Sequence, residues 1–284
     1  MAENITPAVG EMTSPPPEQP PSGEPRLRMR GISKSFGAVR ALFEVDFEVN
    51  AGEVVGLVGD NGAGKSTLIK VISGVGPADE GEIFLEGKQV HIPSPQAANR
   101  MGIETVYQDL ALCDNLDVVA NLFLGREERS FLRFIDEIDM EKQTLNVLRS
   151  LDVKLPSTRT PVATLSGGQR QSVAVAKSIL RQAKVVLLDE PTAALGVAQT
   201  RQVLNLIRRL RDQGLAVVVI SHNLADVFEV VDRVIVMRLG RRVGTFDIKT
   251  TTPEQIVAAI TGAEFGQLMA TNGAAQDNDS VGGK

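Results

Sequence analysis

The sequence contains few of the side chains that usually bind transition metals or cross-link a chain. Among 284 residues there are one cysteine, Cys113, and two histidines, His91 and His222. A single cysteine excludes a disulfide within the chain and fits a reducing compartment. So small a set of cysteine and histidine residues also leaves little for a zinc site.

Long apolar runs and a strong excess of one charge are also missing. No apolar run reaches the roughly 18–20 residues that a helix needs to cross a bilayer, and the start, MAEN, lacks the pattern of a secretory signal. The net charge is -5, with 23% charged and 43% hydrophobic residues, whereas nucleic-acid binding needs a basic surface. We therefore expect a soluble intracellular protein without a nucleic-acid partner, and any contact with a membrane to be peripheral.

Both ends of the chain lack large apolar side chains. Residues 1–25 hold seven of the 14 prolines, and residues 266–284 are rich in glycine, alanine, asparagine and aspartate. Such segments bury too little apolar surface to offset the entropy lost on ordering. We predict a disordered proline-rich tail at 1–25, a folded domain at 26–265 and a flexible tail at 266–284. An alternative for the first tail is a ligand for a proline-binding domain.

Short apolar runs alternate with helix-like spacing through much of the folded region. The runs predict buried strands, and the intervening segments, with apolar residues three or four positions apart, predict helices. This order indicates an α/β fold with a mostly parallel sheet and helices on both faces. The predicted strands are 53–58, 184–188, 216–220 and 233–237, and the predicted helices include 67–73 and 197–212.

Two regions depart from this alternation. Residues 27–50 alternate between apolar and polar side chains, which predicts an antiparallel β edge region. Residues 110–183 are helix-like, as in 140–151, and contain no convincing buried strand. We predict that this second region is a helical insert subdomain.

A glycine-rich loop stands between the strand predicted at 53–58 and the helix that follows. Its sequence, GDNGAGKS at 59–66, fits the pattern of a P-loop NTPase core. Glycines let the backbone N–H groups point at phosphate oxygens, and the helix start adds positive potential. Lys65 can reach the β- and γ-phosphates of ATP, and the Ser66 hydroxyl can bind Mg²⁺. The alternative is a plain glycine-rich turn. The candidate nucleotide-binding residues here are Gly59, Asp60, Asn61, Gly62, Ala63, Gly64, Lys65, Ser66 and Thr67.

Polar residues also follow two other predicted strands. Asp189 and Glu190 end the strand at 184–188, and His222 follows the strand at 216–220. Ligands of parallel sheets bind at the carboxyl ends of strands, so these side chains should lie beside the P-loop. We expect Asp189 to hold Mg²⁺ through water and Glu190 to act as general base on the attacking water. The alternative for the acids is a strand end that meets solvent.

The sequence LSGGQ at 165–169 completes a set of motifs. Small residues before a helix often only cap it, but here LSGGQ occurs in order with the P-loop, Gln108, Asp189-Glu190 and His222. With these motifs, residues 27–262 resemble the ATP-binding-cassette (ABC) ATPases. The resemblance implies a head-to-tail dimer that holds two ATP molecules. Each ATP lies between one P-loop and the partner's signature residues, here Ser166, Gly167, Gly168 and Gln169.

The resemblance also implies roles for single residues. Gln108 would contact Mg²⁺ or the attacking water and report the nucleotide state to a membrane partner. Ser66, Gln108 and Asp189 would therefore be the metal site, and Glu190, His222 and Gln108 the catalytic set. Phe36 matches the aromatic residue that stacks on adenine, although a core phenylalanine is the alternative.

Residues around the motifs indicate a subtype. Gly196 stands where the family usually has an aspartate that contacts the partner subunit, which leaves that contact in doubt. The same glycine, with TVYQDL from Thr105 and NLFLGRE from Asn121, is similar to the ATPases of bacterial ribose, xylose and fructose importers, here in a single-cassette form. The implied partners are permease subunits at the cytoplasmic side of the inner membrane and a periplasmic sugar-binding protein. Another importer or exporter, or a non-transport ABC protein acting on nucleic acid or ribosomes, remains the alternative.

Overall fold

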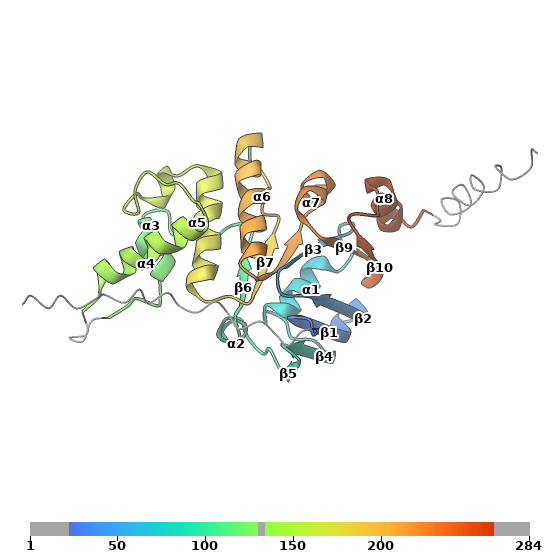
Figure 1. Cartoon of the computed structure of the whole chain (residues 1–284). Coiled ribbons are helices and arrows are strands. Elements are labelled where there is room, and N and C mark those ends of the chain that lie inside the picture. The colour runs from blue at the N-terminus through green and yellow to red at the C-terminus, as the bar shows by residue number, and fades with distance from the viewer. Residues whose placement is uncertain (1–22, 130–133, 264–284) are drawn as a thin grey trace, which may run out of the picture.

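The computed structural model describes residues 23–129 and 134–263. Residues 1–22 of the first predicted tail, 1–25, and all of the second, 266–284, lie outside these residues. The described chain forms two β-sheets with helices packed around them (Figure 1). Among the described residues, no helix combines the length and the apolar character needed to span a membrane.

The larger sheet has six strands in the order β10-β9-β3-β8-β7-β6. Five neighbouring strands are parallel, and β10 pairs with β9 in the antiparallel direction. The mostly parallel sheet predicted from the sequence is confirmed, although the strands β6 and β10 were not predicted. The strands are β3 (Glu53–Val58), β6 (Ile103–Val106), β7 (Val185–Asp189), β8 (Ala216–Ile220), β9 (Arg233–Arg238) and β10 (Arg241–Asp247).

The smaller sheet is antiparallel, with the strand order β2-β1-β4-β5. The antiparallel pairing predicted for 27–50 is confirmed by β1 and β2, but these strands form a separate sheet rather than an edge of the large one. The reason is that β1 pairs on its other side with β4. The strands are β1 (Leu27–Phe36), β2 (Val39–Val49), β4 (Glu80–Leu85) and β5 (Lys88–Val90).

Helices cover both faces of the large sheet. Along β3, Val54 packs in one core cluster and Val55 in the other, because successive side chains of a strand point to opposite faces. The cluster of Val55 also contains residues of the small sheet, α1 and α2. The cluster of Val54 contains residues of α6, α7 and α8. These helices are α1 (Lys65–Ile72), α2 (Pro95–Arg100), α6 (Val197–Asp212), α7 (Leu224–Val230) and α8 (Pro253–Thr261).

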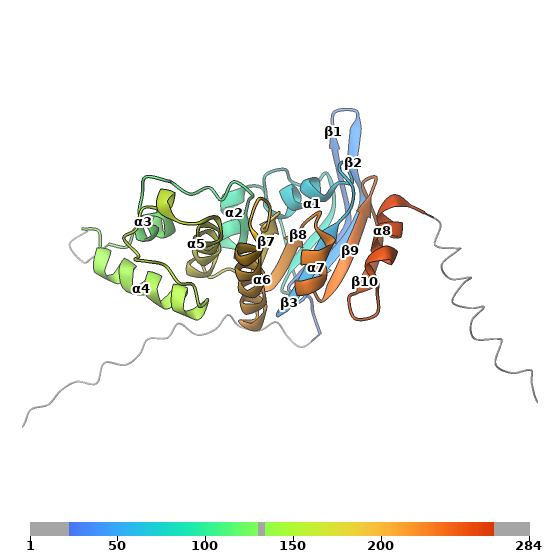
Figure 2. The same ribbon diagram turned by 90° about the horizontal axis from the view of Figure 1, so that it is seen from above.

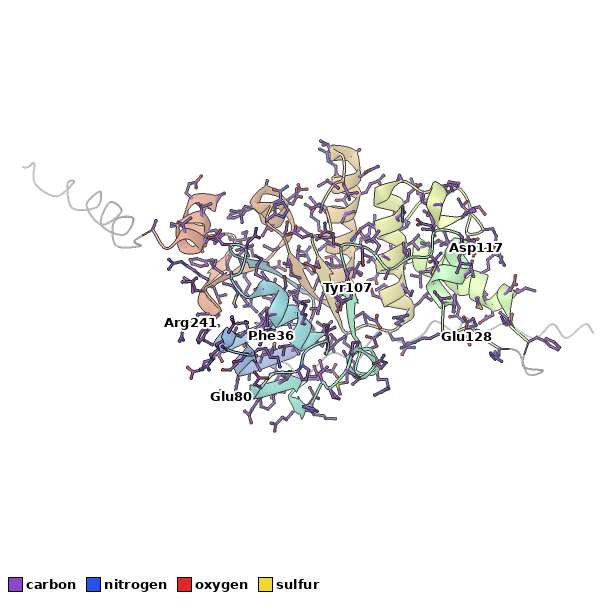
Figure 3. All side chains as sticks on the ribbon, turned by 180° about the vertical axis from the view of Figure 1, so that it is seen from behind. Phe36, Glu80, Tyr107, Asp117, Glu128 and Arg241 are labelled. Carbon is purple, nitrogen blue, oxygen red and sulfur yellow. The ribbon has the colours of Figure 1, made fainter. Side chains whose placement is uncertain are left out.

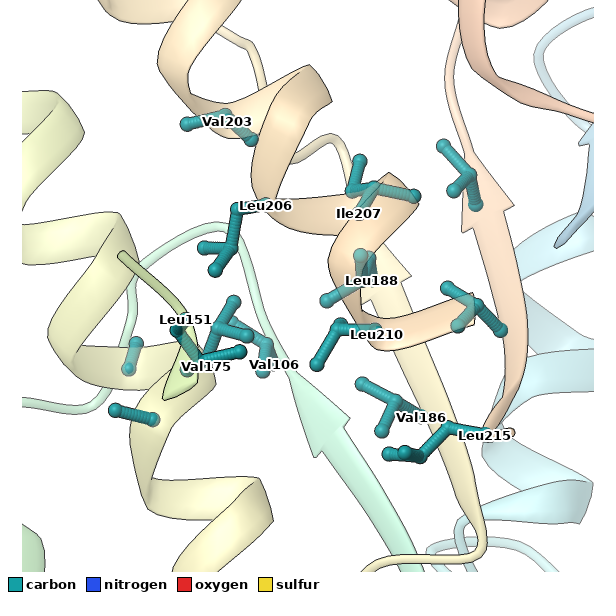
Figure 4. Close-up of a cluster of buried hydrophobic side chains, with 14 of the residues drawn as sticks. Val106, Leu151, Val175, Val186, Leu188, Val203, Leu206, Ile207, Leu210 and Leu215 are labelled. Atoms are coloured by element: carbon teal, nitrogen blue, oxygen red, sulfur yellow. The ribbon is translucent and has the colours of Figure 1, made fainter. Parts of the chain in front are cut away.

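The region 110–183 is helical in its described part and lies at one end of the molecule (Figure 2). Its described residues contain no strand, only two isolated β-bridges. One helix ties it to the sheet: Val175 of α5 lies in one cluster with Leu206 of α6 and Val106 of β6 (Figure 4). The elements are α3 (Val118–Phe123), α4 (Glu137–Ser150), the 3₁₀ turn η1 (Val162–Thr164) and α5 (Gly167–Leu180).

Candidate functional site

The glycine-rich loop after β3 is bent at three glycines. Gly59, Gly62 and Gly64 have φ angles of 150°, 80° and 100°, a region that other residues rarely adopt. Space is also limiting, because a Cβ atom on Gly59 would lie 2.2 Å from the carbonyl oxygen of Met237. The loop therefore needs glycine for its path, and it delivers the chain directly to the start of α1.

Lys65 lies over this loop. Its Nζ donates to the carbonyl oxygens of Gly59 and Asp60, at 2.6 and 2.9 Å. Burial lowers the pKa of Lys65, while the negative charges of Glu190, Asp60 and Asp189 oppose that shift. The ammonium group is thus held within reach of the loop interior and close to the acids that end β7.

Three other predicted groups follow strands that lie on one side of β3 in the large sheet. In the sheet, β8 pairs with β3, β7 with β8, and β6 with β7, all in parallel. His222 follows β8, Asp189 ends β7, and Gln108 follows β6. The prediction that Asp189, Glu190 and His222 share the carboxyl edge of the sheet with the P-loop is confirmed in position.

Glu190 is the residue on which the contacts at this edge converge. Its backbone takes a left-handed conformation, with φ 49°, and its N–H donates to the carbonyl oxygen of Ile220 over 2.9 Å. Glu190 Oε1 lies 2.9 Å from Nδ1 of His222, with side chains 19% and 76% exposed respectively. A carboxylate placed in this way, mostly shielded and next to a histidine, can accept a proton from a water molecule.

Asp189 is suited to a cation. Burial raises the pKa of its carboxyl, the charge of Glu190 raises it further, and Lys65 lowers it. With Ser66 on the first turn of α1 and Gln108 after β6, the edge offers hard oxygen donors of the kind that Mg²⁺ prefers. Among the described residues, no group of three or more His, Cys, Asp or Glu side chains could hold a metal alone. This donor set fits Mg²⁺, which keeps water and phosphate oxygens as ligands.

Phe36 and Gln108 are exposed near the ends of their strands. Phe36 ends β1 and is 53% exposed, so the alternative of a core phenylalanine is wrong. The Lys34 ammonium lies 5.7 Å from the centre of its ring. Phe36 and Tyr107, the neighbour of Gln108, both lie on the side of the molecule shown in Figure 3. A free aromatic face next to a cation is available for stacking on a base.

Asn121 holds the chain after Gln108, whereas its sequence context indicated only a subtype and not this structural role. Its amide is fully buried, accepts from the N–H of Cys113 over 2.7 Å, and donates to the carbonyl oxygens of Cys113, Leu116 and Asp117 at 2.9 to 3.2 Å. Asn121 therefore fixes the segment between Gln108 and α3. The available signal was a polar residue within an otherwise apolar helical stretch.

The LSGGQ segment begins α5. Ser166 Oγ accepts from the N–H of Gln169, and Gln169 Oε1 accepts from the N–H of Ser166, which forms a capping box. Its described neighbours include α6, Leu195 in the loop before α6, and the α4–α5 loop, where Gln169 Nε2 donates to the carbonyl oxygen of Lys154 over 3.3 Å. The segment is therefore a helix cap, and the Ser166 side also remains exposed for a further contact.

The ABC transporter family model matches residues 42–193 of this sequence. The chain belongs to the ABC transporter family. Its folded domain is accordingly an ATP-binding cassette. The chain is 49% identical over 248 residues to the fructose import ATP-binding protein FrcA of Rhizobium meliloti, covering 85% of this chain and 95% of that protein.

Two other relatives differ in how much of their length this cassette covers. Identity is 46% over 242 residues with the xylose/arabinose import ATP-binding protein XylG of Sulfolobus acidocaldarius, covering 85% of this chain and 96% of that protein. It is 42% over 249 residues with the ribose import ATP-binding protein RbsA of Ruegeria sp., covering 87% of this chain but 48% of that protein. The chain thus spans about half the length of the ribose relative.

Solved cassettes have the same fold. The ADP conformation of MJ1267, an ATP-binding cassette of an ABC transporter, matches with a TM-score of 0.72 and 26% identity, covering 87% of this chain and 99% of that one. A nucleotide-free cassette from an ABC transporter matches with a TM-score of 0.69 and 26% identity, covering 84% and 96%. The P-loop NTPase core predicted from the sequence is confirmed.

Gly196 of this ABC protein immediately precedes α6. Its φ is -73°, and its N–H donates to Gln199 Oε1 over 3.4 Å. No heavy atom lies within 4 Å of a Cβ built at this position. The fold of the single chain therefore has room for the aspartate that the family usually carries here, and Gly196 is not required by local packing.

Proposed function

We propose that this cassette is the ATP-hydrolysing subunit of an importer for a monosaccharide. The observation that carries the proposal is 49% identity with a fructose import protein over 95% of that protein's length. A second relative of similar coverage is named for xylose and arabinose import. The complete set of phosphate-site residues supports an active ATPase rather than a regulatory cassette.

In this proposal, different residues bind the base and the phosphates of ATP. Phe36 stacks on adenine, and the loop 59–66, with Thr67, surrounds the phosphates. Lys65 neutralises the β- and γ-phosphates, since among the described residues its ammonium donates to two backbone carbonyl oxygens and to no carboxylate. Ser66, Asp189 and Gln108 hold Mg²⁺, which supplies positive charge to the phosphate oxygens when bound.

Hydrolysis is assigned to the Glu190–His222 pair. Glu190 accepts a proton from water while the water oxygen bonds to the γ-phosphorus and the bond to the β–γ bridging oxygen breaks. The products are ADP and inorganic phosphate. His222 holds the Glu190 carboxylate through the 2.9 Å contact of Nδ1 with Oε1 and faces the incoming γ-phosphate.

The proposed active unit is a homodimer. Ser166, Gly167, Gly168 and Gln169 begin a 14-residue helix without an acidic residue in its first turn, so its N–H groups favour an anion. The described neighbours of these four residues lie on α6, in the loop before it, at Leu195, and in the α4–α5 loop, and none of them belongs to the P-loop. In this proposal, the phosphate that they meet therefore comes from a second copy. Two such sites form when two chains meet head to tail.

The proposed partners are membrane permease subunits and a periplasmic sugar-binding protein, with this subunit at the cytoplasmic side of the inner membrane. The test is to purify the chain with its permease and place the complex in liposomes. ATP hydrolysis is then measured with the binding protein and with ribose, xylose, arabinose or fructose. We expect one of these sugars to stimulate hydrolysis. No stimulation by any monosaccharide, with stimulation by a peptide, amino acid or metal, would contradict the proposal.

A further inference from the structure

The loop that carries Glu190 and the loop that carries His222 are joined by a second contact. The Thr192 hydroxyl donates to Oδ2 of Asp226 over 2.7 Å. Thr192 is only 9% exposed, and Asp226 belongs to the first turn of α7, which follows His222. A hydrogen bond to a carboxylate is stronger than one between neutral groups, so this contact is a firm link between the two loops.

His222 depends on such a link. Its side chain is 76% exposed, and at the site it contacts Glu190. The next residue, Asn223, caps α7 by accepting from the N–H groups of Ala225 and Asp226 at 3.1 and 3.5 Å. The position of the imidazole relative to Glu190 is therefore set by how the first turn of α7 sits against the loop 190–195.

That loop also needs a restraint. Glu190 and Ala194 both have left-handed backbones, with φ 49° and 59°, a conformation that costs energy for residues other than glycine. The N–H of Glu190 is tied to the carbonyl oxygen of Ile220. The Thr192–Asp226 hydrogen bond is a second restraint on the same loop. It acts two residues after Glu190 and through a side chain rather than the backbone.

We propose that Thr192 and Asp226 are positioning residues for ATP hydrolysis. They hold the start of α7 against the loop after Glu190 and so keep His222 in contact with the Glu190 carboxylate. The inference rests on the proposed ATPase function and adds to it two residues outside the candidate site residues. Neither residue needs to touch the nucleotide.

The test replaces the hydroxyl without changing the shape of the side chain. We expect Thr192→Val to lower kcat about tenfold and to leave the KM for ATP within twofold, because a misplaced group costs turnover more than binding. Thr192→Ser keeps the hydroxyl and should recover most of the wild-type kcat. The matched control is Thr158→Val: Thr158 is 7% exposed and donates to Glu141 Oε1 over the same 2.7 Å, far along the chain in the helical region.

The control separates positioning from stability. Both valine variants should lose similar thermal stability, but only Thr192→Val should lose turnover. Equal kcat values for the two valine variants, a loss confined to KM, or no recovery with Thr192→Ser would overturn the inference. If Thr192→Val melts below the assay temperature, Asp226→Asn is measured instead. This variant keeps an acceptor oxygen but not the charge, and we expect kcat to fall about threefold; a wild-type kcat would overturn the inference. A wild-type protein without ATP turnover would contradict the proposed function itself.

Discussion

Two glycine-rich segments begin helices in this protein, and they use glycine for different reasons. In the P-loop, Gly59, Gly62 and Gly64 take left-handed conformations that bend the chain around a central space. In the signature segment, Gly167 and Gly168 do not. There, glycine gives room: a Cβ on Gly167 would lie 2.8 Å from a methyl carbon of Leu195 on the neighbouring loop.

The surroundings of the two segments differ as well. Lys65, at the end of the P-loop, is close to Asp189 and Glu190, so the groups for binding and hydrolysis come from one chain. The signature segment lies against α6, with Ser166 exposed and its cap hydrogen bonds made internally. One segment therefore gathers the groups for binding and hydrolysis, whereas the other is an exposed helix cap that, in the proposed function, contacts the ATP of a second copy.

The largest effect should come from a substitution beside the P-loop, where the groups for hydrolysis lie. Glu190→Gln keeps the shape of the side chain but removes the base, so we expect hydrolysis to fall about 10²–10⁴-fold while ATP binding is retained. The measurement is phosphate release, with nucleotide binding titrated in parallel. Glu82→Gln, at an exposed position of strand β4, is the control. Wild-type turnover by Glu190→Gln would contradict the assignment of the general base.

Removing the lysine tests binding rather than chemistry. Lys65→Ala deletes the cation beside the phosphates, and we expect ATP affinity to fall about 10–100-fold, the weight of a hydrogen bond to a charged group. Lys70→Ala, at the exposed end of the same helix, should bind like the wild type. Equal affinities for the two variants would mean that this loop is not the phosphate site.

A smaller effect is expected on thermal stability, and here the substitution should be stabilising. Because burial and Glu190 raise the pKa of Asp189, the folded state disfavours its ionised form. This penalty is present at neutral pH and vanishes below the ordinary aspartate pKa of about 3.9, where both states are protonated. Asp189→Asn should therefore raise the melting temperature of the nucleotide-free protein at pH 7, by at most about 2–4 °C. The gain should disappear near pH 3.5; a variant less stable than wild type at pH 7 would contradict this account.

The smallest effect concerns the loop beside the signature segment. Gly196→Asp has room in the single chain, and aspartate caps a helix only a few tenths of a kcal/mol better than glycine. We expect the melting temperature of the isolated protein to rise by no more than about 1 °C. The same variant should strengthen ATP-dependent dimers, measured by sedimentation. An unchanged dimer constant would mean that this position does not face the partner.

Much of this fold could be predicted because apolar residues recur at regular spacing in many of its helices and strands. The helix at 197–212 and the strands at 53–58 and 216–220 match α6, β3 and β8. Strand β6 was missed because it is short and carries Glu104, which is 5% exposed and paired with Arg181 over 3.2 Å. A charged residue within a four-residue strand interrupts the apolar run by which a buried strand is predicted.

The site was predictable where a motif holds the chemistry and not where the fold supplies it. The edge residues could be placed because parallel strands end at one edge. The Thr192–Asp226 bond joins residues 34 positions apart, and no local pattern marks it. Similarly, the alternation at 27–50 predicted antiparallel strands but could not tell which sheet they join, since that depends on pairing with β4.

The proposal that the P-loop of one chain works with the signature segment of another is tested most directly by mixing two inactive variants. Lys65→Ala disables the P-loop and Ser166→Arg disables the signature segment, and each variant alone should be inactive. In a mixed dimer, one site carries both lesions and the other carries none. The account predicts that mixing the two proteins with ATP, under conditions that form dimers, restores part of the wild-type ATPase activity. A mixture that forms dimers and stays inactive would contradict the account.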